Sequence, residues 1–537
     1  MFKCKQLLRR ICVVSYVFLL CGGLVNASNL VSKTNTLIGT QGNGWASGYL
    51  YPGATYPFGM VQFTPTYFTK QLGFVINQLS GAGCDHMGNF PTLPIAGALR
   101  VSPDSILNMQ TPVGKEIGTA GYYAATVDHS IRAELTVTER TGMARYTFSS
   151  KEKQGTVIIG GGVAATSIQV AAIKITGPHS CEGYAEGGAF CGIPTPYKVY
   201  FVAEFDADAE SFGTWKEERL HANHTFAEGS HSGVYFTFPL KEGNRAVQYK
   251  IGVSYVSVEN ARENLRVENP AWDFSAVRQA TQDKWNEYLG KIEVEGDNED
   301  RQMQFYTHLY RSLIHPNVCS DVNGEYMGAD SQVHKTARKF YTSFSNWDTY
   351  RTQTALIAML APEETSDIVM SHYLFAEQSG GGFPRWVLAN IETGVMQGDP
   401  TPILVANAYA FGARNYDPRT LLRTMRYGAE VPGANSQGVL TRPGLEQYLE
   451  KGYYDASILL EYTSSDFAIG RFALQACNDE PVCNWYTQRA MNWKNLFNKE
   501  TGWLQSRNED GSWKRYDADW RESTYKISTI LSVFVHG

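Results

Sequence analysis

Short runs of alternating apolar and polar residues mark the first half of the chain. They occur at residues 133–148, 156–159, 198–205 and 247–258, separated by clusters of Gly, Asn, Asp and Pro. Alternation over short segments bounded by turn residues is typical of β-strands with one buried face. Many such strands with few helical patterns predict a large β-sandwich over residues 28–269.

The apolar period becomes helical after residue 269. Five large apolar side chains between residues 270 and 294 fall on one side of a helix, so we predict a linker helix over residues 270–299. Helical segments dominate residues 300–537, with glycine-rich loops between them. Roughly eight helices are recognisable, whereas a toroid closed from six hairpins needs about twelve. The second domain is therefore predicted to be an incomplete (α/α)6 toroid.

Residues 345–360 (SNWDTYRTQTALIAML) combine a polar start with a wholly apolar continuation. On one helix, Trp347, Asp348 and Arg351 would crowd one side of the first turns, because Arg351 is four residues after Trp347 and three after Asp348. A carboxylate beside an indole is a common way to hold a sugar. Ser345 and Asp348 also have the spacing of a capping box, in which Asp348 only satisfies free backbone N–H groups. The residues alone leave both interpretations open.

The composition is that of a globular protein with more than one domain. Of 537 residues, 43% are hydrophobic and 19% charged, and the high aromatic content suits either a carbohydrate-binding surface or a large core. The formal net charge of −6, with no basic stripe, argues against nucleic acid as a partner.

The N-terminus has the pattern of a secretory signal. Four basic residues between positions 3 and 10 precede an apolar run that ends near Val25, and Ala27 provides a small-residue cleavage site. The run is too short for a convincing transmembrane helix, and no later segment has the pattern of a membrane span. Attachment of a lipid at Cys21 is disfavoured because the bulky Leu20 precedes it. We expect residues 1–27 to be removed and the protein to be secreted or periplasmic.

Six cysteines remain after the predicted signal, an even number that permits disulfides in an exported protein. Cys181 and Cys191, like Cys477 and Cys483, are near enough in sequence to close local loops. The pairing of the remaining two, Cys84 and Cys319, stays open. None of the six has metal-ligand spacing, and no metal-binding residue is assigned.

Six stretches of the chain, in order, carry a family resemblance. They are PGATYPFGMVQFTP (52–65), YTHLYRSLIHPNVCSDVNGEY (306–326), SNWDTYRTQT (345–354), GGFPRWVLANIETGVMQGDP (381–400), LLEYTSSDFAIGRFA (459–473) and DWREST (519–524). Together they resemble glycoside hydrolase family 92, the secreted calcium-dependent exo-α-mannosidases. The architecture of that family, a β-sandwich, a linker helix and an (α/α)6 toroid, agrees with the periodicity of this chain.

The resemblance implies removal of terminal α-linked mannose, with an α-1,2 preference, from N-glycan-type oligosaccharides or glycoproteins. It also implies inversion, which needs one carboxylic acid to protonate the leaving oxygen and a more distant carboxylate to activate water. The family's acid falls on Glu522, whose aromatic neighbours would raise its pKa by desolvation. Trp347 and Asp348 match positions that bind the terminal mannose, and Arg351 beside them is expected to bind the substrate with them.

Two departures from the family pattern qualify these expectations. Residues 73–94 differ from the commonest family version, which leaves the linkage preference open. The match ends near residue 526, and the family's general-base aspartates and calcium ligands lie further on. The resemblance therefore implies a calcium cofactor whose ligands are missing here, and a C-terminally truncated member with impaired activity. The alternative is a non-catalytic relic that still binds mannose; another toroid enzyme, such as a polysaccharide lyase, is disfavoured.

Overall fold

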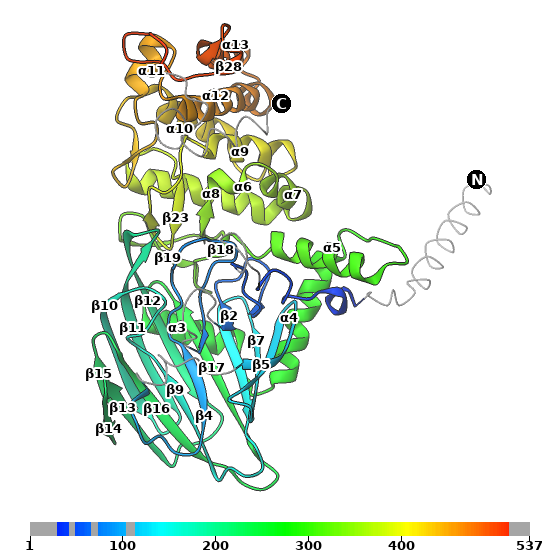
Figure 1. Cartoon of the computed structure of the whole chain (residues 1–537), viewed down its shortest axis with the longest axis vertical. Helices are drawn as coiled ribbons and strands as arrows, with labels where there is room; N and C mark the ends of the chain where they lie inside the picture. The colour runs from blue at the N-terminus through cyan, green and yellow to red at the C-terminus, as the bar shows by residue number, and fades with distance from the viewer. Residues whose placement is uncertain (1–28, 42–48, 66–72, 104–112, 515–537) are drawn as a thin grey trace, which may run out of the picture.

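The computed structural model describes residues 29–41, 49–65, 73–103 and 113–514. The predicted signal peptide and Glu522 lie outside these ranges. The described chain forms two parts stacked along its long axis, a β-sandwich and a helical domain, with helices α4 and α5 at their junction (Figure 1). This arrangement confirms the predicted fold class. Within the described residues, no helix has the length and apolar character needed to cross a lipid bilayer.

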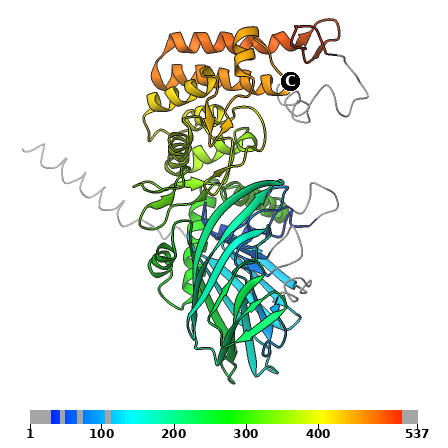
Figure 2. The same cartoon turned by 90° about the vertical axis from the view of Figure 1, so that its left-hand side faces the viewer.

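The sandwich consists of two antiparallel sheets, seen as two layers in Figure 2. The first sheet contains, in spatial order, β1 (Ala54–Thr55), β2 (Gln62–Pro65), β3 (Phe74–Val75), β4 (Thr92–Ala96), β9 (Gln154–Ile159), β16 (Ser232–Pro239), β13 (Ser211–Lys216) and β14 (Arg219–Ala222). The second contains β15 (Phe226–Glu228), β10 (Ile168–Gly177), β11 (Ser180–Phe190), β12 (Ile193–Phe205), β17 (Ala246–Ser254), β8 (Thr141–Thr147), β7 (Ile131–Val137), β6 (Tyr122–Val127) and β5 (Val113–Thr119).

Alternation along the strands places the sandwich core between the sheets. In β7, Ile131, Ala133 and Leu135 are fully buried, while Arg132 and Glu134 between them are partly exposed. Successive side chains of a strand point to opposite faces, so this pattern follows directly from the sequence.

Three helices lead from the sandwich into the helical domain: α3 (Val258–Glu268), α4 (Phe274–Leu289) and α5 (Glu299–Ser312). The last sandwich strand ends at Ser254, so α3 occupies residues that the sequence pattern assigned to the β domain. Helix α3 buries few apolar residues, among them Ala261 and Leu265, which pack against Val202 of β12. The helix predicted after residue 269 is α4.

The helical domain is built around eight further α-helices among the described residues. These are α6 (Asn346–Thr349), α7 (Gln353–Leu360), α8 (Pro362–Ser379), α9 (Thr401–Ala410), α10 (Pro418–Glu430), α11 (Leu445–Lys451), α12 (Ala456–Cys477) and α13 (Glu480–Ala490). Short strand pairs fill the connections: β18 (Asn317–Val318), β19 (Glu325–Met327), β20 (Val333–Lys335), β21 (Tyr341–Thr342), β22 (Phe344–Ser345), β23 (Trp386–Leu388), β24 (Ile391–Glu392), β25 (Asn435–Ser436), β26 (Val439–Leu440), β27 (Phe497–Asn498) and β28 (Trp503–Leu504), with the 3-10 helix η2 (Met491–Leu496). A second 3-10 helix, η1 (Leu30–Lys33), precedes the sandwich and packs against α4 and α5.

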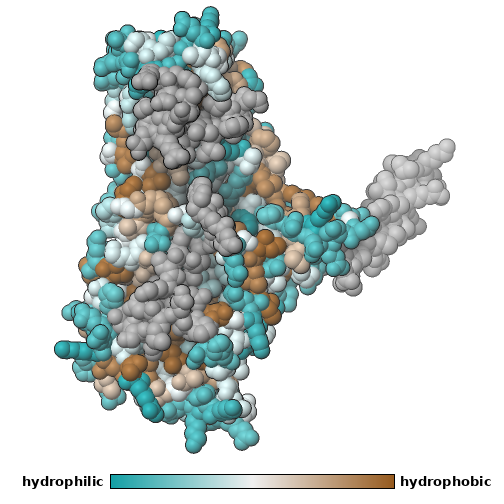
Figure 3. Space-filling view, viewed as in Figure 1, coloured by the Kyte–Doolittle hydropathy of each residue, from teal (hydrophilic) through white to brown (hydrophobic). Residues whose placement is uncertain are grey.

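The two parts share a core. Tyr326, Phe340 and Trp386, which follow the linker helices in sequence, pack into the sandwich core, and the ring of Phe190 stacks on that of Trp386 with centroids 4.2 Å apart. On the outer surface, apolar residues gather mainly in the middle of the face shown in Figure 3, whereas its two ends are mostly hydrophilic.

A buried carboxylate also joins the two parts. Asp321 accepts hydrogen bonds from Ser254 Oγ (2.6 Å), Asn260 Nδ2 (2.8 Å) and Asn264 Nδ2 (2.6 Å). Ser254 ends the last sandwich strand and both asparagines lie on α3. The end of the sandwich and the start of the helical region are therefore held by one side chain.

The disulfide of the described chain joins Cys84 to Cys191, so the predicted local pairing of Cys181 with Cys191 is wrong. Cys181 faces the core near the start of β11, whereas Cys191 follows the end of that strand, about 30 Å away at ~3.3 Å per residue. Cys477 and Cys483 do not pair either; within the described ranges both are free and buried, as are Cys181 and Cys319.

Candidate active site

The segment at residues 345–360 is two helices, not the single helix predicted. α6 ends at Thr349 and α7 begins at Gln353, which leaves Arg351 in the break between them. Thr354 Oγ1 donates a hydrogen bond to the carbonyl of Thr349 (3.1 Å), an acceptor that a continuous helix would give to the backbone N–H of residue 353.

Trp347 and its neighbours converge on a buried carboxylate, Glu461, which lies on α12 and is only 2% exposed. Trp347 Nε1 donates a hydrogen bond to Glu461 Oε1 (3.0 Å), and the Tyr350 hydroxyl donates to Oε2 (3.3 Å). Arg351 Nη2 lies 3.6 Å from Oε1. The sequence signal for Glu461 is an acidic residue within a largely apolar helix, and our sequence interpretation assigned it no role.

Arg351 also covers the two aromatic rings. Its guanidinium carbon lies 4.4 Å from the ring centroid of Trp347 and 4.8 Å from that of Tyr350, which is cation–π geometry. Its Nη1 and Nη2 are buried and make no hydrogen bond within the described structure. One face of the indole is therefore occupied by Arg351, and Trp347 itself is 8% exposed.

Asp348 is the solvent-exposed residue of this cluster. Its side chain is exposed and accepts a hydrogen bond from Ser345 Oγ. Desolvation by the surrounding protein nevertheless raises the pKa of Asp348, against the opposing effects of the Ser345 hydroxyl and the Arg351 charge. α6 has no side-chain cap at its N-terminus, so the capping-box interpretation of Ser345 and Asp348 is wrong. The carboxylate is accessible yet partly enclosed, as a sugar-binding group would be.

A loop of the sandwich is held beside this cluster by two histidines. His86 Nε2 accepts the backbone N–H of Leu79 (2.7 Å), and His315 Nε2 accepts that of Ser80 (2.9 Å). Gln353, the first residue of α7, donates to the carbonyl of His315 (3.3 Å). The loop, the histidines and the start of α7 are thus in direct contact.

Both histidines are neutral in this arrangement. His86 Nδ1 donates to the carbonyl of Cys84 (2.7 Å) and His315 Nδ1 to Asn317 Oδ1 (2.8 Å), so in each ring Nε2 must be the acceptor. Burial lowers the pKa of each imidazole to about 4. The disulfide at Cys84 fixes the same loop to the β11–β12 turn.

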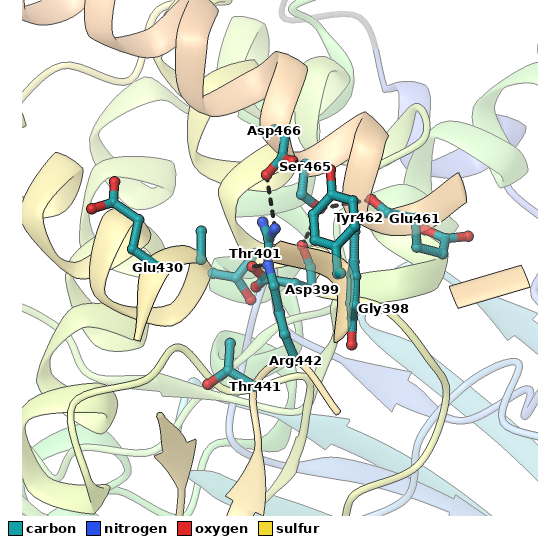
Figure 4. Close-up of polar contacts among 12 residues, drawn as sticks. Gly398, Asp399, Thr401, Glu430, Thr441, Arg442, Glu461, Tyr462, Ser465 and Asp466 are labelled. Atoms are coloured by element: carbon teal, nitrogen blue, oxygen red, sulfur yellow. Dashed lines mark hydrogen bonds and ion pairs between the residues drawn. The ribbon is translucent and has the colours of Figure 1, made fainter. Parts of the chain in front are cut away.

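Next to Glu461 lies a buried ion network (Figure 4). Arg442 is fully buried and donates to Asp399 Oδ2 (2.8 Å) and Asp466 Oδ1 (2.7 Å), and Arg489 Nε donates to Asp466 Oδ2 (2.7 Å). Burial raises the pKa of Asp399, whereas for Asp466 the two guanidinium groups outweigh burial and lower it. The network ties α12 and α13 to the loop around residue 399.

Gly398 connects this network to Glu461. Its backbone has φ +75°, and a Cβ there would lie 2.4 Å from Cβ of Glu461. In Figure 4 Glu461 projects from the helix that also carries Asp466, beside Gly398. The loop therefore packs directly against the carboxylate, and only glycine fits.

The other predicted site features are not placed by this structure. Glu522 lies outside the described residues, and its role as the acid stays a prediction. Among the residues that are described, no group of three or more His, Cys, Asp or Glu could hold a metal ion.

Comparison with known proteins matches both parts of the chain to one family. The model "Glycosyl hydrolase family 92 N-terminal domain" matches residues 34–254, and "Glycosyl hydrolase family 92 catalytic domain" matches residues 260–532. An "Uncharacterized secreted glycosidase" of Arthroderma benhamiae is 25% identical over 565 residues, which cover 91% of this chain and 66% of that protein. This chain spans slightly less than two thirds of that relative's length.

Solved structures of family GH92 enzymes have a fold similar to that of this chain. A family GH92 alpha-mannosidase from Bacteroides thetaiotaomicron has a TM-score of 0.82 at 24% identity, covering 92% of this chain and 69% of its own. A Family GH92 Inverting Mannosidase from the same organism has a TM-score of 0.82 at 25% identity, covering 91% of this chain and 68% of its own. The sandwich, the helical domain and both family matches lead to one assignment: the chain belongs to glycosyl hydrolase family 92.

Proposed function

We propose that this protein is an exported glycosidase that removes terminal α-linked mannose from glycans or glycoproteins. Family membership supports the reaction class, and the solved relatives are described as mannosidases, one of them inverting. The observation that carries the proposal is the cluster at α6, where the accessible carboxylate of Asp348 lies beside the immobilised indole of Trp347.

In this proposal Asp348 accepts hydrogen bonds from mannose hydroxyls, and the part of Trp347 not covered by Arg351 meets the C–H face of the sugar. Arg351 contributes to mannose binding by holding the Trp347 indole in place. Glu522 protonates the leaving oxygen; inversion of the anomeric centre also requires a second carboxylate that takes a proton from the water attacking the opposite face of the ring, a role to which no described residue is assigned. The described residues contain no group of three or more His, Cys, Asp or Glu side chains that could hold a calcium ion.

The test is mannose release from α-1,2-mannobiose, with the α-1,3 and α-1,6 isomers as linkage comparisons. Proton NMR of the first product identifies the anomer, and β-mannose indicates inversion. Asp348→Asn should abolish or strongly weaken mannose binding. Asp297→Asn, at an exposed aspartate, is the matched control and should change nothing. Glu522→Gln should keep binding and lose turnover.

Two results would change the conclusion. If the protein binds mannose but releases none, it is the non-catalytic mannose-binding alternative. If methyl α-mannoside neither binds nor competes, and all three mannobioses are left intact, the proposal is wrong.

A further inference from the structure

Glu461 is an unusual residue for its position. A carboxylate at 2% exposure in a largely apolar helix is costly unless it is paired and hydrogen-bonded. Its two oxygens receive the indole N–H of Trp347 and the hydroxyl of Tyr350, one on each oxygen. Hydrogen bonds to a charged acceptor are roughly twice as strong as neutral ones. Glu461 therefore fixes the polar edges of both rings.

Arg351 holds the faces of the same two rings. The guanidinium lies over Trp347 and Tyr350 rather than forming a close, bidentate ion pair, since its nearest approach to Glu461 is 3.6 Å. A stacked cation attracts the ring face, and its attraction increases when the site is desolvated. The indole is thus held on its edge by an anion and on one face by a cation.

The Glu461 carboxylate is itself held in place by the residues packed around it. Gly398 packs against Glu461 with no space for a side chain, and the hydroxyl of Ser465 on α12 donates to the backbone carbonyl of Asp399. Asp399 is in turn paired with Arg442 in the buried ion network. Glu461 therefore has little freedom to follow a displaced ring.

We propose that Glu461 and Arg351 are positioning residues, which together hold the Trp347 indole in the orientation that a sugar at Asp348 requires. This inference rests on the proposed function for its consequence in mannose binding, but the orientation of the indole can be measured without sugar. In this proposal Arg351 acts by holding the Trp347 indole and does not contact the substrate directly.

The experiment uses the full-length protein labelled with 15N at tryptophan. The indole N–H resonance of Trp347 is identified by its loss in Trp347→Phe, among the signals of 11 tryptophans. Glu461→Gln should shift this resonance, and it should weaken the binding of methyl α-mannoside roughly tenfold. KM for α-1,2-mannobiose should rise more than kcat falls. Asp321→Asn, which alters another buried carboxylate that is bonded to Ser254, Asn260 and Asn264 and not to Trp347, should lower the melting temperature without moving the indole signal.

Milder variants keep the proposal testable if Glu461→Gln does not fold. Tyr350→Phe removes one hydrogen bond to Glu461, and Arg351→Lys keeps the charge but loses the planar stack. Each should shift the same resonance. An unchanged Trp347 signal in folded variants would overturn the positioning role. A shifted signal in a protein that binds no mannose would leave that role standing and reject the proposed function.

Discussion

Acid should destabilise this protein through His86 and His315. His86 is fully buried and His315 partly buried, and each accepts a backbone N–H through Nε2, so protonation would replace an acceptor by a second donor facing that N–H. Burial is the main reason that the pKa of each falls from 6.5 to about 4; for His315 the nearby Arg311 adds to the effect, and for His86 the nearby His315 does so.

The direction and size of this destabilisation follow from the linkage between proton binding and folding. The folded pKa lies below the unfolded one, so as pH falls from about 6.5 the unfolded chain binds protons first and unfolding is favoured. At pH 5 each histidine should reduce the free energy of unfolding by ~2 kcal/mol relative to pH 7.5, and the pair by ~4 kcal/mol. The whole free energy of unfolding of a protein is typically about 5–15 kcal/mol, so the loss from the two histidines is a large part of it. The loss should stop growing below pH 4.

The assay is urea denaturation at pH 7.5, 6 and 5, followed by tryptophan fluorescence. His86→Gln keeps an acceptor near Nε2 that cannot take up a proton, and should flatten the pH dependence by ~2 kcal/mol. His129→Gln, at an exposed histidine, should leave it unchanged. His372, also buried with its pKa lowered to about 4, contributes equally to all variants. If His86→Gln retains the full pH dependence of the wild type, protonation of His86 is not a source of the acid destabilisation.

Three further changes probe the remaining structure. Arg442→Met should reduce the free energy of unfolding by ~3–5 kcal/mol, because its two carboxylate partners stay buried without it; a melting temperature equal to that of the wild type would contradict this. Gly398→Ala should cost ~1–3 kcal/mol from its positive φ, plus the clash with Glu461, and should also shift the Trp347 indole signal. Replacing Cys84 and Cys191 by serine should cost ~2–5 kcal/mol, measured as a lower urea midpoint that reductant no longer changes.

The fold was predictable where local pattern decides it. Alternation identified strands such as β7, and the helical period identified α4, because both patterns follow from which face is buried. The order of strands was not predictable. β9, for example, lies between β4 and β16, which come from segments far apart in the chain. The Cys84–Cys191 disulfide, with a separation of 107 residues, depends on the same long-range arrangement.

The site was predictable only in part, for a similar reason. Trp347 and Asp348 were identified because an indole and a carboxylate adjacent in sequence also lie together in space. Glu461, 114 residues from Trp347, stands out only as an acidic residue within a largely apolar helix, and that local pattern does not indicate which distant side chains it contacts. Arg351 was placed by assuming a continuous helix, which the Thr354 hydroxyl interrupts.

The hydrogen bonds of Asp321 bear on how the chain can be divided. The two family matches meet between residues 254 and 260, and Asp321 binds Ser254 on one side of that boundary and Asn260 on the other. Cutting there would take Ser254 away from the buried carboxylate, which would keep Asn260 and Asn264, and would remove Trp386 from the sandwich core. The boundary between the two family matches therefore crosses a shared apolar core and a hydrogen bond to a buried carboxylate, and we expect the two parts to unfold together.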